Sequence, residues 1–209
     1  MRIARIFYPV KVLGPGERIG IWVNGCLRKC DGCANPELWE LDHSLAISLE
    51  NLCEMIESIF QFYKGHVDGV TISGGEPFMQ MEELMGLINY LKTKTEDILL
   101  YTGYQRSELI KDTLGQKIIE NIAVLVDGPY QKEKNNGEVL RGSLNQTIYY
   151  RDELIKKRYE EYVRMNEGKN MVQNFRIKDG IVAVGIHRDN FREELKRELQ
   201  KKEIIEEGN

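Results

Sequence analysis

The chain has 209 residues, enough for one domain of ordinary size with an apolar core. Hydrophobic residues make up 42% and charged residues 30%, a balance typical of a globular chain rather than a disordered one. The formal net charge of −4 argues against direct nucleic-acid binding, which usually needs a basic surplus. No apolar run approaches the ~20 residues of a membrane span, and residues 1–9 contain no signal-peptide core, so we expect a cytoplasmic protein without a membrane partner.

Short apolar runs in the first 150 residues predict four β-strands, at 19–23, 69–72, 97–101 and 122–126. The runs are nearly continuous rather than alternating, as in parallel strands that are covered on both faces. Two helical patterns, at 49–63 and 84–91, lie between them and repeat apolar residues every three or four positions. Strands that alternate with helices predict an α/β fold with a parallel sheet.

The chain from about residue 151 onward has a different pattern. A charged helix is predicted over about 151–165, with Leu154, Ile155, Tyr159 and Tyr162 as its apolar residues. The pair Asp179-Gly180 between apolar runs at 174–178 and 181–186 predicts a β-hairpin. A second charged helix is expected at about 190–202, with the charge pattern of a solvated surface. We therefore expect residues 151–209 to form a helix–hairpin–helix extension that packs on a main domain of residues 1–150.

Three of the four cysteines are clustered directly after the first predicted strand. Cys26, Cys30 and Cys33 have the spacing C-x3-C-x2-C. An odd cluster cannot pair evenly and a reducing compartment disfavours disulfides, so the spacing indicates a metal site. Loops at the carboxyl ends of strands are where α/β proteins place their chemistry. Arg28 and Lys29 within the loop would favour ionisation of the thiols.

Two kinds of metal site remain open from the residues alone. Structural zinc needs four ligands, and the fourth would have to be His43 or Cys53. Cys53 lies on the apolar stripe of a predicted helix, where a small buried side chain is the commoner role. A [4Fe–4S] cluster usually has four cysteine ligands, so three would leave one iron open to a substrate. We favour the cluster and keep a non-catalytic zinc-binding module as an alternative.

A second motif, Ser73-Gly74-Gly75-Glu76-Pro77, follows the second predicted strand. Together with the cysteine spacing, it resembles the radical S-adenosylmethionine (SAM) enzymes. Within them, the chain looks most like the small glycyl-radical activating enzymes of anaerobic ribonucleoside-triphosphate reductase. Further matches lie at residues 8–10, 14–16, 101–104, 125–128 and 141–146. Gly32 and Ala34 flank the third cysteine where many radical SAM enzymes have aromatic residues. The resemblance covers residues 1 to about 150 and implies an incomplete (β/α) barrel of the radical SAM type there.

The resemblance also implies a set of site residues. Cys26, Cys30 and Cys33 would hold a [4Fe–4S] cluster whose open iron binds the amino and carboxylate groups of SAM. Glu76 would support the SAM ammonium group. The residues assigned to cofactor binding are Gly32, Ala34, Ser73, Gly74, Gly75, Glu76, Thr102, Asp127, Arg141, Ser143 and Asn145. His66 and His187 receive no role.

The implied activity is reductive cleavage of SAM to methionine and a 5′-deoxyadenosyl radical. This radical would take the Cα hydrogen of a glycine on a large glycyl-radical reductase subunit. A one-electron donor such as flavodoxin or ferredoxin would supply the electron. The alternative within the same superfamily is an enzyme that modifies a peptide or small molecule directly, with the hairpin as a docking edge for the substrate.

Overall fold

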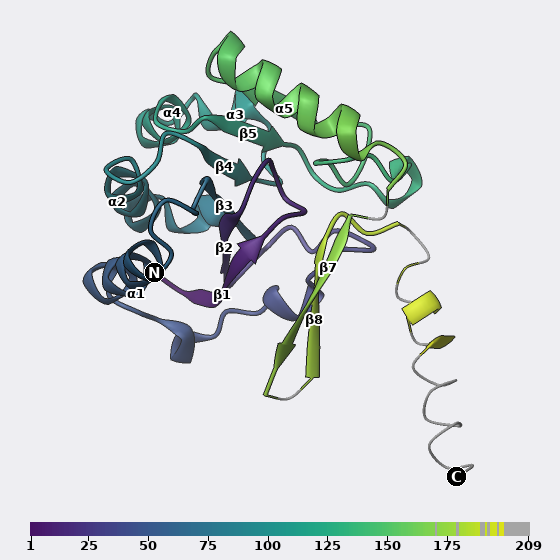
Figure 1. Ribbon diagram of the computed structural model, residues 1–209, viewed down its shortest axis with the longest axis horizontal. Helices are drawn as coiled ribbons and strands as arrows, with labels where there is room; N and C mark the ends of the chain where they lie inside the picture. Colours follow the sequence, from purple (N-terminus) through teal and green to yellow (C-terminus); the bar gives the residue numbers. More distant parts are fainter. Residues whose placement is uncertain (170, 179, 189–190, 192, 196, 199–209) are drawn as a thin grey trace.

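The computed structural model describes residues 1–169, 171–178, 180–188, 191, 193–195 and 197–198. A six-stranded sheet forms its centre (Figure 1). The strands lie side by side in chain order: β1 (Ile3–Val10), β2 (Arg18–Val23), β3 (Gly69–Gly74), β4 (Ile98–Tyr101), β5 (Val124–Asp127) and β6 (Thr147–Tyr150). Strands β2 to β5 run parallel, whereas β1 and β6 pair antiparallel with β2 and β5 at the two edges.

The four predicted strands are confirmed as β2 to β5, with boundaries that differ by at most two residues. The predicted parallel sheet is confirmed for these four strands and is wrong for the edges, because β1 and β6 were not expected. Neither edge strand is reached through a crossover helix, since an antiparallel neighbour does not need one. The strand–helix alternation that reveals the central strands in the sequence is therefore missing at both edges.

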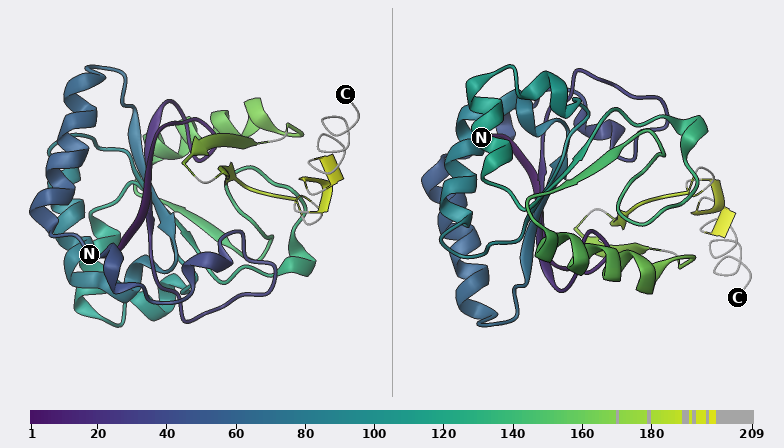
Figure 2. Two further views of the ribbon diagram at one scale, coloured as in Figure 1. Left: turned by 90° about the horizontal axis from the view of Figure 1, so that it is seen from below. Right: turned by 90° about the horizontal axis from the view of Figure 1, so that it is seen from above.

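Helices cover one face of the sheet (Figure 2). They are α1 (Leu49–Phe62), α2 (Met81–Leu91) and α4 (Thr113–Glu120), and the first two confirm the predicted helices. Helix α1 begins where the Asn51 N–H donates to the Ser48 hydroxyl at 3.1 Å, and it buries Leu52 and Ile56 completely. The short helix α3 (Arg106–Leu109) and 3₁₀ turns link the other elements; the turns are Pro36–Leu38, His43–Leu45, Pro77–Gln80 and Lys132–Lys134.

The opposite face of the sheet is covered by α5 (Glu153–Asn166) and by the hairpin of β7 (Val172–Ile177) and β8 (Gly180–Gly185) (Figure 2). The helix and the hairpin agree with the predicted ones. Their second core contains Trp22, Leu99, Val124, Val126, Tyr159, Tyr162 and Val184. Leu154 was expected in the apolar stripe of α5 but is 79% exposed. It lies about 100° around the helix from Ile155, which faces the sheet, and so points away from it.

A buried ionic contact ties α5 to the amino end of the sheet. Arg18, the first residue of β2, is fully buried, and its Nη2 lies 3.0 Å from Oδ1 of Asp97. The Tyr159 hydroxyl of α5 donates to the same carboxylate oxygen at 2.6 Å. Arg18 also donates through Nε to the Thr71 hydroxyl at 2.7 Å. A buried charge needs such partners. These contacts therefore stabilise the amino ends of the parallel strands, and the cavity described below lies at their carboxyl ends.

The expected final helix at 190–202 includes residues 190, 192, 196 and 199–202, which lie outside the described residues, and it stays a prediction. Among the helices that the structure describes, none is long and apolar enough to cross a membrane.

Candidate active site

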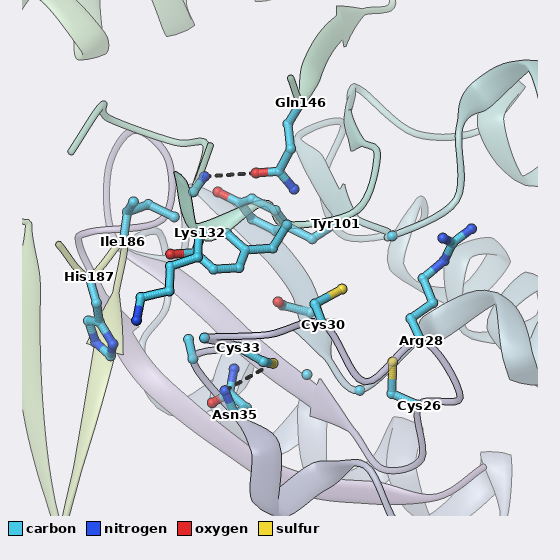
Figure 3. Close-up of a pocket in the computed structure, with 18 of the residues that line it drawn as sticks. Cys26, Arg28, Cys30, Cys33, Asn35, Tyr101, Lys132, Gln146, Ile186 and His187 are labelled. Atoms are coloured by element: carbon cyan, nitrogen blue, oxygen red, sulfur yellow. Dashed lines mark hydrogen bonds between the residues drawn. The ribbon is translucent and has the colours of Figure 1, made fainter. Parts of the chain in front are cut away.

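A cavity of about 340 Å³ lies at the carboxyl ends of the parallel strands (Figure 3). The loops after β2, β3, β4 and β5 all contribute to its walls. Ten of the predicted site residues line it: Cys26, Cys30, Gly32, Cys33, Ala34, Ser73, Gly74, Gly75, Glu76 and Thr102. The two motifs that the sequence singled out therefore face one common space.

The cysteine loop is held by backbone hydrogen bonds to the 3₁₀ turn that follows it. The Gly25 N–H donates to the Leu38 carbonyl and the Cys26 N–H to the Trp39 carbonyl, both at 2.9 Å. Within the loop, the Asn35 N–H lies 3.4 Å from the Cys33 sulfur and donates to it (Figure 3). Main-chain hydrogen bonds thus hold the start of the loop at Gly25 and Cys26 and contact the Cys33 sulfur within it.

None of the four cysteines forms a disulfide, and all four lie in the described part of the chain. Burial raises the pKa of the Cys33 thiol, and hydrogen bonding by Asn35 and Trp39 acts in the opposite direction. Arg28 lies over the Tyr104 ring, with its Cζ 4.2 Å from the ring centroid, and its Nη2 lies 3.5 Å from a Glu108 oxygen.

The cysteine loop and the glycine motif are joined at their backbones. The Gly75 N–H donates to the Val23 carbonyl and the Glu76 N–H to the Gly25 carbonyl, both at 2.8 Å. Gly74 has a φ of +112°, and a Cβ there would lie 2.4 Å from the Val23 nitrogen. A Cβ on Gly75 would lie 2.4 Å from the Gly25 oxygen. Only glycines allow this approach, so the motif fixes the relative position of the two loops.

Glu76 is 1% exposed, and protein donors surround its carboxylate. One oxygen accepts from the Thr102 hydroxyl at 2.7 Å and from the Phe78 N–H at 3.1 Å, and the other accepts from the Gly103 N–H at 2.8 Å. Burial raises the pKa of Glu76, and these hydrogen bonds oppose the shift. The carboxylate therefore links the ends of β3 and β4 at the edge of the cavity.

The other four predicted residues are not among those that line the cavity. Asp127 accepts from the Arg106 N–H at 2.6 Å. Arg141 donates to the Gln146 carbonyl at 2.9 Å, the Ser143 hydroxyl accepts from the Gln131 N–H at 3.1 Å, and the Asn145 amide donates to the Pro129 carbonyl at 2.7 Å. The contacts of Arg141, Ser143 and Asn145 lie within the loop of residues 128–146. Residues of this loop that do reach the cavity are Gly128, Tyr130, Lys132, Gly142 and Gln146.

Sequence reasoning missed a whole wall of the cavity. The cavity is also lined by Gly185 at the end of β8 and by Ile186, His187, Arg188, Phe191 and Glu193 after it. Figure 3 shows Ile186 and His187 at one side of the site. His187 had received no role. The local signals were the predicted hairpin and the helix predicted at about 190–202, and neither indicates that these residues reach the cavity.

The donor set of the cavity fits a [4Fe–4S] cluster. Three thiols from one loop line the space, whereas Cys53 lies on α1 and is not among the lining residues. Sulfur ligands from a short cysteine run are typical of iron–sulfur sites. Within the described residues, no group of three or more His, Cys, Asp or Glu side chains is arranged to hold a single metal ion. Three thiols on one short loop therefore suit an iron–sulfur cluster with one open iron.

Comparison with known proteins agrees with this geometry. The family model described as a 4Fe-4S single cluster domain matches residues 12–149. The chain is 30% identical to the anaerobic ribonucleoside-triphosphate reductase-activating protein of Enterobacteria phage T4 over 153 residues, which are 71% of this chain and 94% of that protein.

Two further relatives match parts of the chain. It is 34% identical to the protein of the same name from Vibrio cholerae over 149 residues, 68% of this chain and 94% of the relative. It is 32% identical to a pyruvate formate-lyase-activating enzyme of Listeria monocytogenes over 79 residues, 38% of this chain and 32% of that enzyme. The cavity brings together three thiols and a glycine motif that is hydrogen-bonded to the same loop. Together with these matches, it shows that the chain belongs to the family of anaerobic ribonucleoside-triphosphate reductase-activating proteins and contains a 4Fe-4S single cluster domain.

Proposed function

We propose that this protein is a radical SAM enzyme that generates a glycyl radical on the large subunit of an anaerobic ribonucleoside-triphosphate reductase. The observation that carries the proposal is the shared cavity, in which three thiols of one loop face the glycine motif that is locked to the same loop. The relatives named as activating proteins for such a reductase support the partner.

The cavity residues would have two roles, to bind the cluster and to orient SAM. Cys26, Cys30 and Cys33 would hold the cluster through three irons, and the fourth iron would take the amino and carboxylate groups of SAM. When bound, such a cluster supplies one electron to the sulfonium of SAM, which breaks into methionine and a 5′-deoxyadenosyl radical. Gly74 and Gly75, which both line the cavity, would keep the glycine motif packed against the cysteine loop and so hold the two sides of the SAM site together.

The remaining cavity residues limit the space around the radical. Gly32 and Ala34 leave room beside the thiols, whereas Trp39 and Tyr101 present rings to the cavity. Rings at this position exclude water, which protects a reactive intermediate from side reactions. We assign Arg141, Ser143 and Asn145 to SAM binding only through the loop of residues 128–146, within which their contacts lie. Asp127 would act through the end of β5, where it accepts from the Arg106 N–H.

We further propose that residues 1–150 form an incomplete (β/α) barrel and residues 151–209 an extension packed on it. The six-stranded sheet with helices α1, α2 and α4 on one face supports the first part, and the core shared by α5, β8 and the sheet supports the second. A flavodoxin or ferredoxin would reduce the cluster in the cytoplasm.

Anaerobic reconstitution followed by electron paramagnetic resonance tests the function. The protein is loaded with iron and sulfide, reduced, and mixed with SAM and the reductase subunit. We expect about four irons per chain and a doublet glycyl signal on the reductase. Deoxyadenosine without any protein radical would overturn the proposed target and favour direct modification of a peptide or small molecule. Colourless protein with stoichiometric zinc would overturn the enzyme itself.

A further inference from the structure

The side chain of Trp39 brings a hydrogen-bond donor to the cavity. Its residue lines the cavity together with Cys33. The indole Nε1 is buried, and among the residues that the structure describes no acceptor meets its N–H in full hydrogen-bond geometry. Burying a donor without an acceptor is costly. We therefore expect an acceptor for this N–H to form when the cavity is loaded.

The main chain fixes Trp39 at the cysteine loop. The Trp39 carbonyl accepts from the Cys26 N–H at 2.9 Å, and the Trp39 N–H donates to the Pro36 carbonyl at 3.2 Å. The 3₁₀ turn that leads to Trp39 begins at Asn35, whose own N–H donates to the Cys33 sulfur at 3.4 Å (Figure 3). Trp39 is thus bonded through its backbone to the first cysteine of the loop, and the turn before it contacts the third.

The indole group acts on the sulfur of Cys33. Burial raises the pKa of the Cys33 thiol, and hydrogen bonding by Asn35 and by the Trp39 side chain opposes that shift. The sulfur of a neutral thiol is a weak acceptor, which agrees with the incomplete geometry at Nε1. The form of cysteine that binds a metal is the thiolate, and hydrogen bonds to charged acceptors are shorter and roughly twice as strong. The N–H of Trp39 is therefore suited to the ligand form of Cys33.

A donor to a ligand sulfur affects how readily the cluster accepts an electron. Reduction adds one electron and no proton, so negative charge on the sulfur ligands rises and an N–H donor stabilises the reduced form more than the oxidised form. Hydrogen bonds to the sulfurs are among the features that set the reduction potential of iron–sulfur clusters. We propose that Trp39 is a positioning residue whose indole N–H donates to the cluster-bound thiolate of Cys33 and thereby raises the reduction potential of the cluster. This inference rests on the cluster of the proposed function and is independent of the polypeptide on which the enzyme acts.

A redox titration of the reconstituted protein, followed by electron paramagnetic resonance of the reduced cluster, tests the hydrogen bond. Trp39→Phe keeps an aromatic ring and removes the N–H. We expect the equilibrium constant for reduction to fall about three- to tenfold, which is ~30–60 mV at ~59 mV per tenfold for one electron. The variant should keep the iron content of wild-type protein. An unchanged potential in Trp39→Phe at full iron content would overturn the proposal.

Trp22→Phe is the matched control for this titration. Trp22 is 4% exposed, belongs to the second core and is not among the residues that line the cavity. The same chemical change at this position should leave the potential of the cluster as in wild-type protein. An equal fall in both variants would overturn the proposal, because the contact with Cys33 would then not be the cause.

A second measurement leaves Trp39 itself unchanged. The chain has two tryptophans, so Trp39 is the remaining one in Trp22→Phe, and tryptophan labelled with ¹⁵N in the indole ring then marks one nitrogen. Pulsed electron paramagnetic resonance of the reduced cluster should detect a coupling to this nitrogen through the N–H···S contact. Absence of the coupling would overturn the proposal even where Trp39→Phe fails to bind iron.

The assay with the reductase separates this inference from the proposed function. If the potential falls in Trp39→Phe but wild-type protein forms no glycyl radical on the reductase, the hydrogen bond stands and the proposed target fails. If wild-type protein forms the radical and the potential of Trp39→Phe is unchanged, the proposed function stands and the hydrogen bond fails.

Discussion

The Thr102 hydroxyl donates a hydrogen bond to the carboxylate of Glu76 at 2.7 Å, although the two residues follow different strands. Both are buried, and the same hydroxyl accepts from the Tyr104 N–H at 3.1 Å. The pair therefore fixes the distance between the ends of β3 and β4, where the cavity opens. A polar contact of this kind is costly to break because its partner stays buried.

Replacing Thr102 with valine tests this link. Thr102→Val keeps the shape of the side chain but removes the donor to Glu76 and the acceptor for the Tyr104 N–H. We expect the free energy of unfolding to fall by about 1–3 kcal/mol, measured by urea denaturation. Thr93→Val is the matched control, since its hydroxyl contacts only an exposed carbonyl at the end of α2, and it should cost clearly less. Equal losses in the two variants would contradict the link.

Loss of one loop thiol should abolish cluster binding without unfolding the protein. The loop is positioned by main-chain hydrogen bonds from Gly25 and Cys26, which Cys30→Ala leaves in place. We expect no SAM cleavage and a large loss of iron after anaerobic reconstitution, with circular dichroism like that of wild-type protein. Cys53→Ala should keep its iron, because Cys53 does not line the cavity. Full turnover by Cys30→Ala would count against the cluster assignment.

The glycine motif should tolerate no side chain at Gly74. In Gly74→Ala the new Cβ meets the Val23 backbone at 2.4 Å, and the positive φ adds strain. Gly65→Ala is the matched control, because Gly65 also has a positive φ but nothing lies within 4 Å of its Cβ position. We expect a cost of about 1–2 kcal/mol for Gly65→Ala and a larger cost for Gly74→Ala. Iron retention after reconstitution should fall only in Gly74→Ala.

The buried ion pair at the amino end of the sheet should be a major source of stability. Asp97→Asn leaves the charge of Arg18 buried without its counter-ion, and we expect a loss of about 3–5 kcal/mol in urea denaturation. Arg158 also contacts Asp97, at 3.0 Å, but its side chain is 41% exposed. Arg158→Ala should therefore cost less than about 1 kcal/mol. If Asp97→Asn lowered the free energy of unfolding by less than about 1 kcal/mol, the Asp97 carboxylate would not be needed to balance the buried charge of Arg18.

Stability should fall in acid partly through Glu57. Its hydrogen bonds from Lys94 and Tyr90 lower the pKa of Glu57 from the ordinary 4.5 to about 2. A carboxyl with a lowered pKa in the folded state contributes stability above the ordinary pKa and loses it as the pH falls through the lowered one. We expect wild-type protein to be more stable than Glu57→Gln at pH 7, with the difference shrinking between about pH 5 and pH 2. A constant difference across that range in urea denaturation would contradict this.

The chemistry of the site was readable from local sequence. Cys26, Cys30 and Cys33 need only a short loop to share one cavity, and Gly74-Gly75 signals a close backbone approach wherever it occurs after a strand. The four central strands were equally visible, because burial on both faces demands continuous apolar runs.

Contacts between residues distant in the chain determine the features that the sequence did not predict. Glu76 lines the cavity as expected, but two of its three hydrogen-bond donors, Thr102 and Gly103, lie 26 and 27 residues away in the chain. The edge strands β1 and β6 were not predicted, and the helix predicted at about 190–202 did not indicate that Phe191 lines the cavity together with His187. Periodicity and spacing report how a segment meets its nearest neighbours in the chain. The segments that donate hydrogen bonds to a buried carboxylate, or that form a cavity wall, can be distant in the chain. Tertiary packing brings them together, and local sequence does not report it.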